Sequence, residues 1–395
     1  MTSTAATEFP MTVPLLDLNR QNGVLHADLM AACERVLRSG HFIQGAEVEA
    51  FEADCAHFLG VKHAIAVSSG TDAILVALMA LDIGPGDEVI CPSFTFFATA
   101  GCVARVGATP VFADVEPHTF NLDAADVARR ITPRTKALIP VHLFGQTADL
   151  DALLPLARAH SLAVIEDAAQ ALGARHGERF AGTLGDCGTY SFFPSKNLGG
   201  FGDGGLVATN RDDLAERIRL LRTHGAKPKY FHAVVGGNFR LDALQCALLR
   251  VKLPHLPAYC AARRAHAAEY HRALAALPGI APGGGMDSAA GARLILPATS
   301  PARTHIWNQF TLRVPGAGRR DALRQQLTQS GIGMEIYYPL PLHRQQCFAH
   351  LPAVTLPVSE QLAGEVLSIP VFPELGEAEG QEIIARLIQF AAKSG

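Results

Sequence analysis

The feature that most constrains the fold is a regular alternation of short apolar runs with helical patterns between residues 64 and 166. The apolar runs, each typical of a buried strand, are 64–67, 88–91, 110–115, 137–143 and 162–166. The helical patterns between them are 68–81, 96–106, 122–130 and 150–160. Strands that alternate with helices in this way predict a mostly parallel sheet with helices on its faces. We therefore expect an α/β fold built around one such sheet.

The rest of the chain adds elements on both sides of this core. Helices are expected at 26–37 and 47–59, strands at 188–193 and 206–209, and mainly helix from 212 to about 277. A glycine-rich patch at 283–285 then precedes a smaller set, with strands at 310–314 and 334–338 and helices at 321–330 and 381–392. The pattern predicts a flexible N-terminus over 1–12, a large domain over 13–262 and a smaller C-terminal α+β domain over 263–395.

Composition excludes several classes of protein. The chain has 395 residues, of which 49% are hydrophobic and 18% charged, enough for one large core and a second domain. A net charge of -3 without a basic stripe argues against nucleic acid or a membrane surface as a partner. Eight cysteines without C-x-x-C and sixteen histidines without H-E-x-x-H predict neither a metal site nor a disulfide framework. No signal peptide or long apolar run is visible, so we expect the cytoplasm.

One lysine in an unusual setting is the first candidate for chemistry. Only seven of the 34 basic residues are lysine, and most of these lie in polar stretches typical of a surface. Lys196 instead lies between F-F-P-S and L-G-G, at the mouth of a glycine-rich loop. Apolar surroundings limit the solvation of an amine and lower its pKa, which favours a Schiff base or a general base. A lysine that caps a loop would fit this stretch as well.

Three glycines in the same loop imitate a dinucleotide site. Gly200, Gly202 and Gly205 satisfy the pattern G-x-G-x-x-G. That pattern requires a strand before it and a helix that begins within it. Here the strand-like residues 206–209 follow, so we interpret the glycines as a hairpin-like loop. A nicotinamide-dependent oxidoreductase would depend on these glycines alone.

Two further stretches lie where predicted strands end. Ser68-Ser-Gly-Thr71 precedes a helix, where free N–H groups and a hydroxyl suit a phosphate ester, although Ser and Thr also cap helices routinely. Val164-Ile-Glu-Asp-Ala-Ala-Gln170 ends a buried strand in two carboxylates, which face opposite ways because strand side chains alternate. We predict that Asp167 faces the pocket beyond the sheet, where it would pair with a protonated ring nitrogen. A helix N-cap is the alternative role for Asp167.

Aromatic residues complete the set. The stretch Pro92-Ser-Phe-Thr-Phe-Phe-Ala98 follows another strand, and one of its rings could stack on a planar cofactor or belong to the core. Pyridoxal phosphate (PLP) needs a phosphate site, a partner for its pyridinium, a stacking face and a Schiff-base lysine. All four features occur on the strand-end side of one predicted domain. We therefore predict PLP as the cofactor.

Carrying these features, the sequence resembles the DegT–DnrJ–StrS group of nucleotide-sugar aminotransferases, within the fold-type I PLP enzymes. The resemblance extends from P-L-L-D-L at Pro14 to the C-terminal helix. Its motifs are S-G-T-D-A (69–73), P-S-F-T-F-F-A-T (92–99), E-D-A-A-Q (166–170), S-F-F-P-S-K-N-L-G (191–199), G-D-G-G (202–205) and N-F-R-L-D-A-L-Q (238–245). It implies a large PLP-binding domain with a mostly parallel sheet and a smaller C-terminal domain.

The resemblance implies a role for each motif residue. Lys196 would carry the cofactor as a Schiff base, and Asp167 would pair with the pyridine nitrogen. The remaining cofactor contacts would be the phosphate ligands Gly70, Thr71 and Ser191, the stacking ring Phe96, and Gln170 at the ring hydroxyl. Asn238 would reach across a homodimer interface to the phosphate of the neighbouring site. Arg240 and Tyr338 would face the substrate, and Tyr337 stands where a histidine is common in the family.

The implied reaction is a two-stage transamination from an amino acid, expected to be L-glutamate, to a keto nucleotide-sugar. The loop from Phe192 to Gly205 resembles that of enzymes that aminate 3-keto sugars, whereas 4-keto enzymes more often have a histidine shortly after the Ser-Phe pair. We expect a 3-keto hexose, with a 4-keto sugar as the alternative. PLP-dependent sugar dehydratases of this group replace the lysine with histidine, so Lys196 argues against that activity. A non-catalytic regulatory protein would not need Lys196, Asp167 and Ser191.

Overall fold

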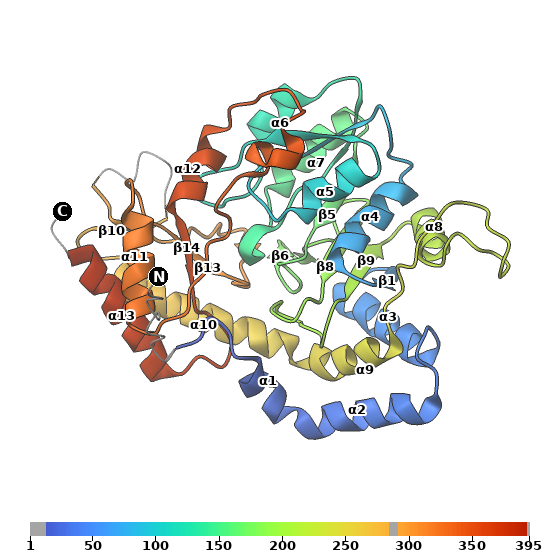
Figure 1. The fold of residues 1–395 in the computed structure, drawn as a ribbon, viewed down its shortest axis with the longest axis horizontal. Helices are drawn as coiled ribbons and strands as arrows, with labels where there is room; N and C mark the ends of the chain where they lie inside the picture. The colour runs from blue at the N-terminus through green and yellow to red at the C-terminus, as the bar shows by residue number, and fades with distance from the viewer. Residues whose placement is uncertain (1–12, 284–290, 393–395) are drawn as a thin grey trace, which may run out of the picture.

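The fold is organised around a seven-stranded sheet (Figure 1). The computed structural model describes residues 13–283 and 291–392. The strand order is β1-β9-β8-β5-β4-β2-β3, and β9 is the only strand of this sheet that runs antiparallel to its neighbours. The strands are β1 (His63–Val67), β2 (Glu88–Pro92), β3 (Thr109–Ala113), β4 (Thr135–Leu138), β5 (Ala163–Asp167), β8 (Cys187–Ser191) and β9 (Gly205–Thr209). The expected α/β fold with a mostly parallel sheet is confirmed.

Helices cover both faces of this sheet because its strands are apolar on both sides. In β1, Ile65 and Val67 pack with α4 (Gly70–Ala80), α5 (Ala98–Arg105) and α8 (Asp212–Arg222). The alternate residues Ala64 and Ala66 belong to the core on the other face of the sheet. That face is covered by α2 (His26–Ser39), α3 (Ala46–Leu59) and α9 (Ala243–Lys252), and near β2 and β4 by α6 (Ala124–Arg130) and α7 (Leu150–Ala159). Period-two alternation thus fills two cores from one strand.

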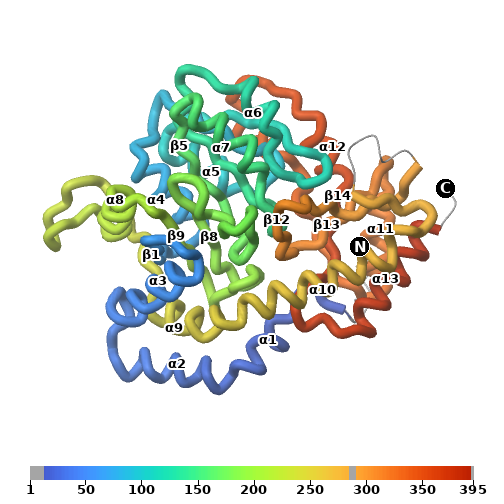
Figure 2. Tube along the Cα trace, turned by 180° about the vertical axis from the view of Figure 1, so that it is seen from behind, coloured from blue at the N-terminus to red at the C-terminus, as the bar shows by residue number. Residues whose placement is uncertain are grey.

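A second sheet forms a separate core toward the C-terminus (Figure 2). Its strands, in the order of the sheet, are β10 (Ile280–Ala281), β11 (Leu294–Ile295), β13 (Phe310–Arg313) and β14 (Val366–Ile369). The helices of this part are α10 (Leu256–Leu274), α11 (Arg319–Gln329), α12 (Pro357–Glu365) and α13 (Glu377–Ala392), and α1 (Leu18–Val24) lies near the N-terminus. A small sheet joins β6 (Arg175–His176), β7 (Arg179–Phe180) and β12 (Arg303–Thr304). Val13 pairs with Ile332, which ties the start of the described chain to this second core.

Several sequence-based boundaries need correction. The expected strand at 334–338 is wrong. Within this stretch only Glu335 pairs with a strand, through a bridge to Ser368 in β14. The expected strand at 137–143 ends at Leu138. The expected helical stretch from 212 to about 277 is interrupted, because residues 223–242 are turns and isolated bridges.

Other expectations stay untested. The predicted domain boundary at residue 263 falls inside α10 and stays a prediction. The predicted flexible segment 1–12 and most of the glycine-rich patch, residues 284 and 285, lie outside the described residues. Within the described ranges, none of the helices has the length and apolar character needed to cross a membrane.

Candidate active site

The candidate site lies where strands β1, β2, β5 and β8 of the large sheet end. The chain leaves β1 into Ser68-Ser-Gly-Thr71, β5 ends at Asp167, and β8 ends at Ser191, five residues before Lys196. Because these strands are parallel to one another, their carboxyl ends meet at one edge of the sheet, where open α/β sheets bind ligands. Phe96 follows β2 at the same edge.

The start of α4 presents free backbone donors beside Ser191. The hydroxyl of Ser69 accepts the N–H of Asp72 at 3.0 Å, and its carbonyl accepts the N–H of Ala73 at 2.9 Å. Among the described residues no acceptor takes the N–H groups of Gly70 and Thr71, the first two of the helix. A Cβ on Gly70 would lie 2.7 Å from the Cβ of Ser191, so only glycine fits this close approach. The helix N-terminus and a hydroxyl together suit an anion.

The two adjacent carboxylates at the end of β5 face opposite ways. Glu166 is buried and accepts hydrogen bonds from the backbone of Gly182, Leu184 and Gly185 and from His142, and these partners hold its pKa below the usual value despite burial. Asp167 accepts instead from the hydroxyl of Thr99, at 2.8 Å, and from the N–H of Ala169. Burial raises the pKa of Asp167, and these two bonds and the charge of Lys196 oppose that rise. Of the pair, Asp167 is therefore the carboxylate that lies near Lys196.

Lys196 is half-buried in the turn that follows β8. Its backbone N–H donates to the carbonyl of Phe193 at 2.8 Å, which closes the turn. Desolvation by burial lowers the pKa of its amine to about 8, although the charge of Asp167 opposes this shift. An amine with that pKa is partly neutral near physiological pH and can act as a nucleophile or a base.

The glycine-rich loop is not a dinucleotide site. Gly205 already belongs to β9, and the next helix, α8, begins only at Asp212. The condition that a helix begins within G-x-G-x-x-G is therefore not met. A Cβ on Gly205 would lie 2.3 Å from the carbonyl oxygen of Ser69, so this glycine lets β9 approach the turn that begins α4.

Aromatic and amide groups from distant parts of the chain complete the site. Gln170 donates from Nε2 to the hydroxyl of Tyr338 at 3.1 Å and accepts the N–H of Phe144 at Oε1 at 2.7 Å. The ring of Tyr338 lies 6.3 Å from that of Phe96, centre to centre. Phe96 is 56% exposed, so one face of its ring is open to a ligand. The C-terminal part of the chain thus contributes to the edge of the large sheet.

Arg240 lies in a segment that pairs with the end of β1, directly before the anion site of its own chain. Arg240 bridges Val67, and the carbonyl of Phe239 accepts the N–H of Ser68 at 2.9 Å. Asn238 bridges Thr223 through the backbone. The predicted contact of Asn238 with a neighbouring site stays a prediction.

Three groups near the site escaped the sequence analysis. Thr99, which orients Asp167, lies three residues after Phe96, where a helical turn brings it to the same side. His343 contacts the hydroxyl of Ser93 at 2.6 Å and Glu360 at 3.0 Å, which anchors the loop that carries Tyr338. Lys252 is buried, not at the surface, and donates to the carbonyl of Gly199 at 2.6 Å. Burial lowers its pKa to about 8.

The residues present fit PLP. The free N–H groups of Gly70 and Thr71, with the hydroxyl of Ser191 close to Gly70, suit the phosphate group. The buried carboxylate of Asp167 suits a protonated ring nitrogen, and the partly neutral amine of Lys196 suits an aldehyde. The second N–H of the Gln170 amide, which no described acceptor takes, suits the ring hydroxyl.

Comparison with known proteins shows similarity to one family of aminotransferases over almost the whole chain. Residues 24–388 match the model of the DegT/DnrJ/EryC1/StrS aminotransferase family. A protein of Geobacillus stearothermophilus named a pleiotropic regulatory protein is 48% identical over 96% of this chain and 99% of its own length. The UDP-N-acetyl-3-dehydro-α-D-glucosamine 3-aminotransferase of Acidithiobacillus ferrooxidans is 44% identical over 95% of this chain and 96% of its own.

Solved structures agree with the fold. DesV of S. venezuelae, in complex with a ketimine intermediate, superposes with a TM-score of 0.91 at 43% identity and covers 98% of this chain and 100% of its own. NtdA of Bacillus subtilis, with bound cofactor PMP, superposes with a TM-score of 0.87 at 30% identity and covers 98% of this chain and 87% of its own.

Proposed function

The chain belongs to the DegT/DnrJ/EryC1/StrS aminotransferase family, a family of PLP-dependent transaminases, and we propose that it transfers an amino group from L-glutamate to C-3 of a nucleotide-linked 3-keto hexose. The observation that carries the proposal is the position of Lys196, with a pKa of about 8, beside the buried Asp167 at the strand ends of one sheet. The name of the Acidithiobacillus relative supports position 3 of the sugar. A 4-keto sugar remains the alternative substrate.

In the proposed site each residue has a separate task. The N–H groups of Gly70 and Thr71 and the hydroxyl of Ser191 bind the phosphate. The ring of Phe96 stacks on the cofactor, and Gln170 bonds its hydroxyl. When bound, PLP supplies an aldehyde that condenses with the donor's amine and a ring that takes up the electron pair released at the donor's α-carbon.

Lys196 and Asp167 carry the proton chemistry of the proposal. With PLP bound, the amine of Lys196 would take a proton from the donor's α-carbon and would later deliver a proton to the cofactor. Asp167, held by Thr99, keeps a proton on the ring nitrogen. Water would release the keto acid of glutamate at the end of the first stage. In the second stage the same residues would move the protons in the reverse order on the keto sugar, which would leave as an amine.

We further propose a homodimer in which Asn238 reaches the phosphate of the neighbouring site and Arg240 and Tyr338 face the substrate. Exposed phenylalanines near the site support a second copy, namely Phe96, Phe193 and Phe201. Monomeric proteins seldom expose apolar side chains in groups. The division into domains at residue 263 and a cytoplasmic location belong to the same proposal.

The experiment that tests the function is the visible absorption spectrum of the PLP-reconstituted protein, before and after L-glutamate, for wild type and Lys196→Ala. We expect a yellow band in wild type that glutamate bleaches, and neither feature in Lys196→Ala. UDP- and dTDP-linked 3-keto and 4-keto sugars are then compared as acceptors.

Each contrary outcome has its own meaning. A wild-type protein without the band would overturn the Lys196 assignment and favour a regulatory role, which the name of the Geobacillus relative suggests. A band that glutamate leaves unchanged would keep the cofactor and reject this donor. Preference for a 4-keto sugar would reject position 3.

A further inference from the structure

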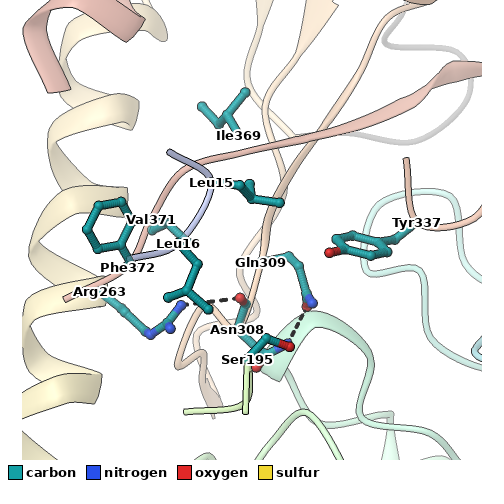
Figure 3. A pocket seen from close by; sticks show the side chains of 10 residues that line it. All are labelled: Leu15, Leu16, Ser195, Arg263, Asn308, Gln309, Tyr337, Ile369, Val371 and Phe372. Carbon is teal, nitrogen blue, oxygen red and sulfur yellow. Dashed lines mark hydrogen bonds between the residues drawn. The ribbon is translucent and has the colours of Figure 1, made fainter. Parts of the chain in front are cut away.

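A small cavity lies between the loop of Lys196 and the second core (Figure 3). Its volume is about 50 Å³. Ser195 and Tyr337, which line it, are the residues directly before Lys196 and Tyr338. Polar side chains of Arg263, Asn308 and Gln309 gather at one side, and apolar side chains such as Leu16 and Phe372 lie at the other. We call this space the Arg263 cavity.

Arg263 brings a buried cation to this cavity. It is 4% exposed, and its Nη1 donates to the carbonyls of Trp307 at 3.1 Å and Asn308 at 3.2 Å. Its Nε has no acceptor among the described residues. No carboxylate of the described chain forms an ion pair with it, and Glu374 attracts it only from a distance. Desolvation lowers its pKa to about 10, so the guanidinium is charged at physiological pH but poorly compensated.

Asn308 adds an unsatisfied acceptor. It is 7% exposed, and its Nδ2 donates to Oε1 of Gln309 at 2.6 Å. Its Oδ1 is buried without a partner in the described part of the chain. Buried polar atoms are seldom left unpaired, so an orphaned donor on Arg263 and an orphaned acceptor on Asn308 at one cavity indicate a missing polar ligand.

The size of the cavity limits that ligand. A water molecule needs roughly 10–15 Å³ of the same kind of volume, so 50 Å³ holds about three or four small groups. A carboxylate with its attached carbon has this size, whereas a sugar ring or a nucleotide does not fit. A guanidinium that lacks a carboxylate partner is the complementary group, because Arg and carboxylate pair through charge-assisted hydrogen bonds.

We propose that the Arg263 cavity binds a carboxylate group of the amino donor, with Arg263 as its cationic partner. This inference rests on the proposed transamination, since the donor is the carboxylate-bearing reactant. Ser195, the residue before Lys196, lines the cavity, so the cavity borders the loop that carries the reacting amine. Where the α-carboxylate occupies the cavity, the unpaired Oδ1 of Asn308 accepts an N–H of the donor's ammonium group before that amine condenses with the cofactor. Tyr337 forms part of the same wall.

The test uses calorimetry with glutarate, a dicarboxylate that cannot be transaminated. Asn308→Asp keeps the size of the side chain and adds a carboxylate that competes for Arg263. The PLP-loaded variant is expected to keep its absorption band and its melting temperature, while its affinity for glutarate falls at least about tenfold. The apparent KM for L-glutamate should rise by a similar factor.

Asn210→Asp is the matched control. It adds the same charge at the exposed end of β9, where Oδ1 accepts the N–H of Lys62, and should bind glutarate as wild type does. Equal affinity in wild type, Asn308→Asp and Asn210→Asp overturns the proposal, as does a wild type that does not bind glutarate. Arg263→Lys is a second test. This variant keeps the positive charge but loses the planar guanidinium, so its affinity for glutarate should fall several-fold.

Two further readouts separate the possible failures. Calorimetry measures binding without turnover. If glutamate bleaches the PLP band but Asn308→Asp leaves the affinity for glutarate unchanged, only the proposed role of the cavity is rejected. If wild type shows no PLP band, the proposed function is rejected. L-alanine carries only an α-carboxylate. A matching loss with L-alanine assigns the cavity to the α-carboxylate, and a loss confined to glutamate assigns it to the side-chain carboxylate.

Discussion

The side-chain amide of Gln170 joins two distant parts of the chain by donating a hydrogen bond to the hydroxyl of Tyr338 at 3.1 Å. Gln170 follows β5 of the large sheet, and Tyr338 belongs to a loop whose Ile336 packs against the second core. The other end of the amide accepts the N–H of Phe144, so Gln170 has little freedom to rotate. The pair fixes the C-terminal loop against the strand ends that carry Asp167.

Removing the hydroxyl in Tyr338→Phe should loosen this loop. The loss of a buried hydrogen bond, with Nε2 of Gln170 left unpaired, is expected to lower the free energy of unfolding by about 1–3 kcal/mol. Urea unfolding measures it. Tyr337→Phe is the control, because its hydroxyl makes no hydrogen bond in the described chain, and it should change stability by less than about 0.5 kcal/mol. Equal effects of the two changes would show that the Gln170 bond contributes nothing.

The lowered pKa of Lys196 predicts how its removal changes stability with pH. Its pKa is about 8 in the folded protein and near 10.5 in the unfolded chain. Between these values the unfolded state binds more protons, so the contribution of Lys196 to stability rises with pH. Below pH 8 the whole cost of burying the charge is present and lowers the free energy of unfolding by at most about 3 kcal/mol. Above pH 10.5 this cost disappears.

Lys196→Met without PLP should therefore be more stable than wild type at pH 7, and the difference should shrink toward pH 10. Urea unfolding of both proteins at the two pH values tests this, because the other titrating groups are common to both and cancel. Lys136→Met, at an exposed position, serves as the control and should change stability little at either pH. A difference for Lys196→Met that stays constant with pH would mean that burial does not shift its amine.

The large sheet was predictable because its strands and helices are each visible as local patterns. Strands such as β2 are buried on both faces and read as continuous apolar runs, which alternate with long helical periods. The elements of the second core were harder to predict from the sequence. The stretch 334–338 has the β-branched and aromatic residues of a strand, yet only Glu335 pairs, whereas the four residues of β14 follow α12 without any turn signal.

The site residues also fall into two groups, those that local sequence predicts and those that depend on distant contacts. Asp167 and Lys196 were predictable because each follows a recognisable strand and has a distinctive local setting. The contact of Thr99 with Asp167 spans 68 residues, and the burial of Lys252 depends on the carbonyl of Gly199, 53 residues away. Tertiary contacts of this length leave no periodic signal in the sequence.

Thr99 should matter through Asp167. Thr99→Val removes the hydrogen bond to Oδ2 while keeping the shape of the side chain. A bond to a charged group is worth about 1.5–3 kcal/mol, so the rate at which glutamate bleaches the PLP band should fall at least about tenfold. Thr99→Ser restores the hydroxyl and should recover most of that rate. If valine and serine behave alike, the hydroxyl does not orient Asp167.

The close approach of α4 to β8 predicts a strong effect of one methyl group. In Gly70→Ala the new Cβ would lie 2.7 Å from the Cβ of Ser191, so the helix start must move away from the hydroxyl. Overpacking of this kind costs typically about 1–3 kcal/mol, and the displaced N–H groups should bind phosphate less well. We expect a lower melting temperature and a PLP dissociation constant raised about tenfold or more, measured by equilibrium dialysis. Gly364→Ala in α12 is the matched control, since nothing lies within 4 Å of its new Cβ, and it should leave both quantities unchanged or slightly raise stability. A Gly70→Ala protein that binds PLP as wild type does would reject the start of α4 as the phosphate site.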